Sequence, residues 1–120
     1  MSRDEKIGGA ERATVAKCER SVAPLSKVLE RLDEAESLYG VGRKYAALSK
    51  VSGAFTSLAL AYSKDLLDEE DWKNLSAEIH RVRMAILREE PTLHVFLGLD
   101  KAREIVERKL FEKFAECLKK

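Results

Sequence analysis

The sequence predicts an all-α protein, an antiparallel four-helix bundle whose first helix is kinked or split near Pro24. Apolar residues recur at three- and four-residue spacing along most of the chain, and no segment shows the alternation of a strand. Glycine, proline and aspartate divide this pattern into four helical segments with short connections, which favour antiparallel neighbours. The 120 residues suffice for one domain, and we expect a flexible segment over residues 1–9 followed by a single helical bundle domain over residues 10–120.

The first predicted helix carries a heptad seam of apolar residues. Its two columns are Val15, Val22 and Leu29, and Cys18, Leu25, Leu32 and Tyr39. Pro24 lies inside this seam, lacks an amide donor and clashes with the preceding turn, so we expect a kink or a restart with Ser21 as N-cap. Gly40 and Gly42 then end the helix and turn the chain.

The second predicted helix, over residues 42–64, is poor in charge. No acid occurs between Ser37 and Lys64, and Lys50 is the only charged residue from Tyr45 to Tyr62, although 36% of the whole sequence is charged. We expect its large apolar residues to form the buried stripe and its Ala, Ser, Thr and Gly residues to face outward. The expected stripe is Val41, Tyr45, Leu48, Phe55, Leu58 and Tyr62, widened by Val51 and Leu60. Gly53 costs up to about 1 kcal/mol relative to Ala, which indicates a close helix crossing there.

Two further helices follow. Asp68 is a strong N-cap with acids in the next three positions, and Pro91 ends that helix near residues 88–90. Its core stripe is Leu75, Ile79, Val82 and Ile86. We expect one or two helical turns over residues 92–97, an interruption of the helix at Gly98, and a last helix capped by Asp100. That helix has the stripe Ala102, Val106, Leu110, Phe114 and Cys117.

Composition narrows the class of protein. The net charge of +1 neither demands nor forbids an anionic partner, while the absence of Gln and the single Asn, Asn74, resemble the composition of hyperthermophile proteins. Apolar runs fall far short of the roughly 20 residues of a membrane span, and residues 1–9 lack the apolar core of a signal peptide. We therefore expect a cytoplasmic protein with no membrane partner.

Catalytic and ligand-binding patterns are weak. His80 and His94 lack metal-ligand spacing, so we expect no metal, no cofactor, no small-molecule substrate and no enzymatic activity. The spacing of Arg88 and His94 resembles the Arg-x(4–6)-His motif of the HEPN ribonuclease families, which are helical and of similar size, and this resemblance implies an RNA-cleaving pair. Here two acids and a proline stand between the pair, and the acids would repel the phosphate backbone.

The only two cysteines, Cys18 and Cys117, lie near the start of the first helix and the end of the last. These ends lie together in an up-down-up-down bundle, so a disulfide is feasible, and intracellular disulfides are characteristic of hyperthermophiles. The alternative is a pair of reduced cysteines that serve as small core residues. The sequence leaves both interpretations open.

The charge-poor second helix favours a non-enzymatic protein-protein interaction module or a small subunit of a larger complex. Such a module would self-associate or bind a protein partner through this helix, because small side chains lose little entropy at an interface. The candidate interface residues are Tyr45, Ala47, Gly53, Ala54, Ser57, Ala61 and Tyr62. A rival interpretation makes this helix the most enclosed member of the bundle, with Ala54, Ser57 and Ala61 facing neighbours in the same chain.

The alternative function is an RNA- or DNA-binding accessory subunit. A basic strip on the second and third predicted helices would then contact phosphates without reading sequence. The residues of this strip are Arg43, Lys44, Lys50, Arg81 and Arg88.

Overall fold

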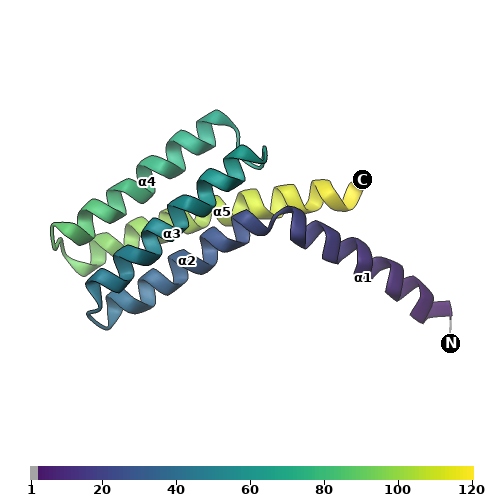
Figure 1. The fold of residues 1–120 in the computed structure, drawn as a ribbon, viewed down its shortest axis with the longest axis horizontal. Helices are drawn as coiled ribbons and strands as arrows, with labels where there is room; N and C mark the ends of the chain where they lie inside the picture. The colour runs from purple at the N-terminus through teal and green to yellow at the C-terminus, as the bar shows by residue number, and fades with distance from the viewer. Residues whose placement is uncertain (1–2) are drawn as a thin grey trace.

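The computed structural model describes the backbone of residues 3–120 and the side chains from Gly9 onward, and this part of the chain is all-helical. The helices are α1 (Arg3–Ser21), α2 (Ala23–Gly40), α3 (Lys44–Ser63), α4 (Glu69–Leu87) and α5 (Thr92–Lys119). Helices α2 to α5 lie side by side with alternating directions, whereas α1 projects away from them (Figure 1). The molecule is therefore elongated, with extents of 59 × 32 × 19 Å. The all-α class is confirmed, but the structure has five helices where we expected four.

The additional helix arises from the split at Pro24. Pro24 occupies the first turn of α2, where its missing amide hydrogen has no intrahelical acceptor in any case. Val22 stands between the two helices and caps α2 without a side-chain hydrogen bond, so the expected cap at Ser21 is wrong because Ser21 is the last residue of α1. At its other end α1 begins at Arg3, within the segment 1–9 that we expected to precede the domain. The flexibility of that segment stays a prediction.

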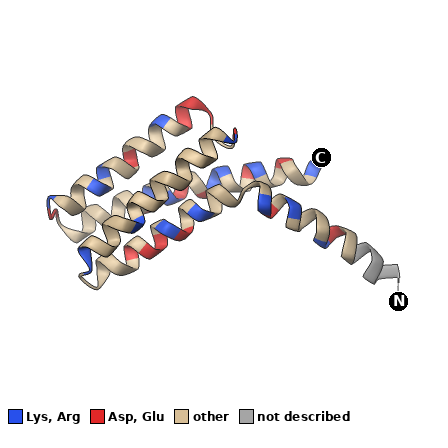
Figure 2. Ribbon diagram, viewed as in Figure 1, with Lys and Arg blue, Asp and Glu red and all other residues tan. Residues whose placement is uncertain are grey.

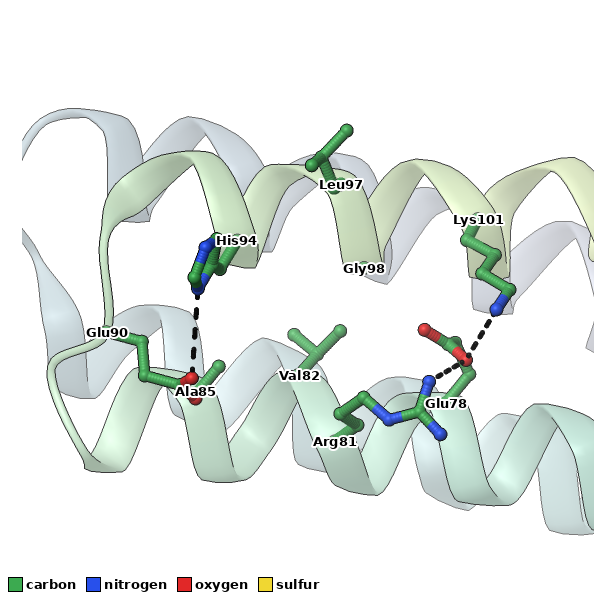
Figure 3. Close-up of a pocket in the computed structure, with 9 residues that line it drawn as sticks. All are labelled: Glu78, Arg81, Val82, Ala85, Glu90, His94, Leu97, Gly98 and Lys101. Carbon is green, nitrogen blue, oxygen red and sulfur yellow. Dashed lines mark hydrogen bonds and ion pairs between the residues drawn. The ribbon is translucent and has the colours of Figure 1, made fainter.

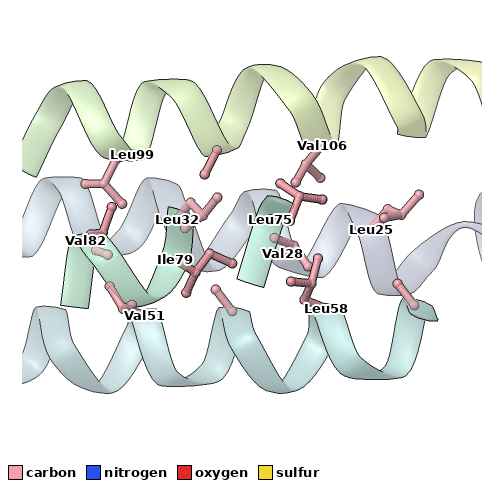
Figure 4. Packing of buried hydrophobic residues seen from close by; sticks show 14 of the residues in the cluster. Leu25, Val28, Leu32, Val51, Leu58, Leu75, Ile79, Val82, Leu99 and Val106 are labelled. Atoms are coloured by element: carbon pink, nitrogen blue, oxygen red, sulfur yellow. The ribbon is translucent and has the colours of Figure 1, made fainter. Parts of the chain in front are cut away.

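One apolar core lies between α2, α3, α4 and α5 (Figure 4). Its largest fully buried aliphatic residues come from all four helices: Leu25, Leu32, Leu58, Leu75, Ile79, Ile86 and Leu99. Each such side chain contributes about 1.5 to 3 kcal/mol relative to an exposed one. Within the described side chains, the core cluster contains no residue of α1.

The start of α4 is as predicted. The Asp68 carboxylate accepts a hydrogen bond of 2.7 Å from the backbone N–H of Asp71, and this bond lowers the pKa of Asp68 below its ordinary value. The predicted stripe, Leu75, Ile79, Val82 and Ile86, is buried. The next turn differs from the prediction, because α5 runs without a break from Thr92 through Gly98. Asp100 is therefore no N-cap; its Oδ1 lies 3.2 Å from Nη1 of Arg103 on the same helix.

Gly98 permits a close approach of α5 to α4. A Cβ at this position would lie 2.7 Å from Cγ2 of Val82, far inside van der Waals contact. The close crossing expected at Gly53 is not there, because a Cβ at Gly53 would meet only the Arg31 stem, at an ordinary 3.5 Å. Gly98, which we predicted to interrupt a helix, is thus a packing residue. Gly53, where we predicted a close helix crossing, is under no steric constraint.

Replacing Gly98 with Ala should lower the free energy of unfolding by about 1 to 3 kcal/mol, because overpacking against Val82 outweighs the better helix propensity of Ala. The matched control is Gly53→Ala, which should stabilise the protein by up to about 1 kcal/mol. Urea unfolding followed by circular dichroism measures both. Equal stabilisation by the two substitutions would contradict the close crossing at Gly98.

Candidate functional site: the outer face of α3

Alanine lines the buried face of α3, contrary to the prediction. Ala47, Ala54 and Ala61 are 0% exposed and alternate with Val51 and Leu58, which are also 0% exposed. These positions form a heptad seam that packs most extensively against α2, where the small alanine side chains let the two backbones approach. Placing the three alanines at an interface with a partner is therefore wrong. The rival interpretation holds for Ala54 and Ala61.

The outward side of α3 carries no charged side chain. We define the α3 outer face as the exposed residues of this helix, all of them uncharged: Tyr45, Ser49, Ser52, Phe55, Thr56, Leu60, Tyr62 and Ser63. Figure 2 shows the corresponding ribbon as mostly tan between the charged neighbouring helices. The 20 residues of α3 make this uncharged stripe about 30 Å long.

The predicted interface residues differ in exposure: the two tyrosines are exposed, Gly53 and Ser57 are half-buried, and the three alanines are buried. Tyr45, which is 78% exposed, and Tyr62 belong to the α3 outer face. Gly53 and Ser57 are half-buried beside it. Large apolar residues that we expected in the core stripe thus project outward, and small residues that we expected to face outward pack inside.

The two lysines of α3 are engaged by acids of neighbouring elements. Lys50 forms an ion pair with Glu34 of α2, and the hydrogen bond between them lowers the pKa of Glu34. Lys44 Nζ lies 2.9 Å from Oε1 of Glu89, and this hydrogen bond raises the pKa of Lys44. Both charges are balanced within the chain, so they add no net charge beside the α3 outer face.

An aromatic cluster joins the α3 outer face to α4. Tyr62 stacks on Trp72 with ring centroids 5.1 Å apart and an interplanar angle of 6°. Phe55 also contacts Trp72, at 5.6 Å and a tilt of 51°. Phe55 is 41% exposed and Tyr62 36% exposed, so the cluster presents rigid apolar surface to solvent.

A recess of about 310 Å³ lies between α3 and α4, continuous with the α3 outer face. Its lining is Val51, Ser52, Phe55, Thr56, Ile79, His80 and Arg83. Val51 and Ile79 are buried and provide an apolar floor, while hydroxyl groups and Arg83 occupy the exposed positions. A recess of this kind accepts a large apolar side chain whose edge carries a polar group.

The basic strip of the alternative function is largely compensated. Besides Lys44 and Lys50, Arg81 is also paired, with Nη1 2.8 Å from Oε2 of Glu78, a carboxylate that Lys101 approaches to 3.7 Å (Figure 3). The remaining two, Arg43 and Arg88, lie at the start of α3 and the end of α4. Nucleic-acid binding stays a prediction, with fewer free cations than the sequence indicated.

The groove between α4 and α5 contains His94 but not Arg88 (Figure 3). His94 Nδ1 lies 3.8 Å from Oε1 of Glu90, on the side of the groove formed by the α4–α5 turn. Arg88 is not among the lining residues, so this groove does not gather the pair that the HEPN resemblance implies.

Cys18 and Cys117 form a disulfide, with their Cα atoms 5.6 Å apart. The bond joins the last turn of α1 to the C-terminal end of α5. It closes a loop with a sequence separation of 99 residues. Of the two interpretations that the sequence left open, the structure contains the disulfide.

The described side chains contain no group of three or more His, Cys, Asp or Glu residues arranged to hold a metal ion. Within residues 3–120, none of the helices combines the length and the apolar character required to cross a bilayer. No protein-family model matches this chain, and comparisons with curated proteins and with solved structures found no match. Function is therefore inferred from the physical properties of the α3 outer face.

Proposed function

We propose that this protein is a non-enzymatic interaction module that associates with a second copy of itself through the α3 outer face. One observation carries the proposal: every exposed residue of α3 is uncharged, in a chain of which 36% is charged. Charged residues are depleted from the centres of protein interfaces, because their desolvation is costly. A solvated face has no such reason to exclude them along a 20-residue helix.

A second copy suits this face better than a charged partner. Two-fold association brings the same surface of both subunits together, so any net charge on it would repel itself. The α3 outer face has none, because its flanking residues Lys44 and Lys50 are balanced by Glu89 and Glu34. The Ser and Thr side chains along its middle are short, which lets two helices approach closely at little entropic cost.

Large side chains at the two ends of the stripe provide the anchors. Tyr45 lies near the start of α3, while Leu60 and Tyr62 lie near its end. Aromatic residues dominate interface energetics, and Tyr62 is already held in place by its stack on Trp72. The recess beside Ser52 and Thr56 provides a matching hollow for a large side chain of the opposite copy.

The test compares Ser52→Lys with Ser37→Lys by size-exclusion chromatography with light scattering. Ser52 lies in the middle of the α3 outer face, and Ser37 is an exposed serine on α2. A lysine at position 52 should convert a dimer into a folded monomer, whereas the same change at position 37 should leave the mass unchanged. Dimers that persist in both variants would contradict an interface centred on α3.

The choice of lysine separates this proposal from the RNA- or DNA-binding alternative. An added positive charge opposes burial in an apolar interface but strengthens contact with phosphates. Retained or tighter binding of single-stranded RNA or DNA by Ser52→Lys, together with a steep salt dependence, would favour the accessory subunit that uses Arg43 and Arg88.

A further inference from the structure

The disulfide is the principal attachment of α1 to the rest of the molecule. Among the side chains of α1 that the structure describes, from Gly9 to Ser21, Cys18 alone is buried, at 1% exposure. Within the described part of the chain, α1 packs only against α2 and α5. The core between α2 and α5 is complete without it, and the helix leans away from the bundle (Figure 1).

A crevice of about 650 Å³ opens beside this disulfide and is lined by both cysteines. Four lysines, Lys17, Lys64, Lys113 and Lys120, also line it, against two acids, Asp65 and Glu116, so the lining carries an excess of positive charge. Lys113 lies 3.4 Å from Glu116, whereas the other three form no ion pair with any described residue. Cys18 is buried and Cys117 is partly exposed, so Cys117 is the cysteine of the pair that has surface open to solvent.

We propose that the Cys18–Cys117 bond is a reducible latch, open to exchange with an external dithiol through this crevice, and that its reduction releases α1 while α2 to α5 stay folded. Positive charge favours the approach of a thiolate and stabilises the thiolate that leaves. After reduction, the burial of the small Cys18 side chain is what remains to hold the described part of α1 against the bundle. This burial does not offset the loss of backbone entropy that an ordered helix requires.

The exchange consists of two successive substitutions at sulfur. A thiolate of the dithiol attacks Sγ of Cys117, and the electron pair of the disulfide leaves with Sγ of Cys18, which takes a proton from water. The second thiol of the reagent then loses its proton to water. The resulting thiolate attacks the reagent's first sulfur, which is bonded to Sγ of Cys117 in the mixed disulfide. Cys117 leaves as a thiolate and is protonated. The protein gains two electrons and two protons, and the dithiol becomes a cyclic disulfide.

The experiment treats the folded protein with dithiothreitol in the absence of denaturant, traps free thiols, and follows the mass and the amide hydrogen exchange. Reduction should be first-order in dithiothreitol, and the amides of residues 9–20 should exchange at least about tenfold faster after it, with those of α3 and α4 unchanged. The variant Cys18→Ala/Cys117→Ala should show the same fast exchange without reductant. A reduction rate that is independent of dithiothreitol, an α1 that stays protected, or a bundle that unfolds throughout would each overturn the latch.

The lysines are tested with a pair of variants matched in charge. Lys17→Gln/Lys64→Gln removes two charges from the crevice, while Lys27→Gln/Lys73→Gln removes two that are paired with Glu30 and Glu69 outside it. The reduction rate of the first variant should be lower than that of the wild type by a factor of roughly three or more. The second variant should be reduced at the wild-type rate. Equal rates in all three proteins would overturn the part of the proposal that assigns exchange to this crevice.

Discussion

Replacing Ala54 with Glu should unfold or nearly unfold the protein. Ala54 is 0% exposed at the centre of the seam between α3 and α2, so the substitution buries a carboxylate without a partner and overfills a tightly packed site. The expected loss of unfolding free energy is at least about 4 kcal/mol. Urea unfolding followed by circular dichroism measures it.

The control for this prediction is Ala77→Glu, the same substitution at an exposed position of α4. It should change the stability by no more than about 0.5 kcal/mol. If Ala54→Glu were as stable as Ala77→Glu, the seam of α3 would face outward. The assignment of Ala54 to the buried face of α3 would then be incorrect.

Removing the disulfide should cause the second large effect. For a loop of 99 residues, loss of the constraint on the unfolded chain lowers the free energy of unfolding by about 4 to 5 kcal/mol. The freedom that a released α1 regains in the native state adds to native entropy and reduces this loss. Guanidinium unfolding of Cys18→Ala/Cys117→Ala should therefore show a clearly lower midpoint than the oxidised wild type. A midpoint equal to that of the oxidised protein would contradict a stabilising role for the bond.

Much of the fold is predictable because local signals and packing agree. The Asp68 cap, the four-residue stripe of α4 and the interruption at Pro24 each have one local physical cause, and each is found in the structure. A proline inside a heptad pattern cannot donate to the preceding turn, so the chain restarts whatever its neighbours are. At these positions the chemistry of the residue and its close neighbours in sequence is enough to predict the local structure.

The predicted orientation of α3 is wrong because this helix carries two apolar stripes, only one of which can face the core. One contains large residues such as Tyr45, Phe55 and Tyr62, and the other contains Ala47, Val51, Ala54, Leu58 and Ala61. Hydrophobicity favours the first stripe, whereas the regular alternation of four- and three-residue steps in the second is the geometric signature of a helix seam. The seam of small residues is the buried one because α2 approaches closely.

The prediction of a helix boundary at Gly98 is wrong for a related reason. A glycine followed by a good capping residue resembles a helix boundary in sequence, but the need for a missing Cβ arises from Val82, which is distant along the chain. Only the tertiary arrangement shows that need. The same holds for the stack of Tyr62 on Trp72, which joins residues of two different helices.

The uncharged segment that forms the candidate site is visible in the sequence, although the outward-facing residues are not. Ser49, Ser52, Thr56 and Leu60 become interface candidates once the seam is known, whereas the acids that neutralise Lys44 and Lys50 come from other elements. Charge content along one helix is a local property. Which residues face outward, and which charges are already paired, depend on the packed structure.

Self-association is tested most simply by the mass of the wild-type protein, measured by light scattering after size exclusion at low and at high salt. Association through an uncharged face predicts a dimer, about twice 13.5 kDa, that persists or strengthens as salt rises. A monomer at both salt concentrations would contradict self-association through the α3 outer face.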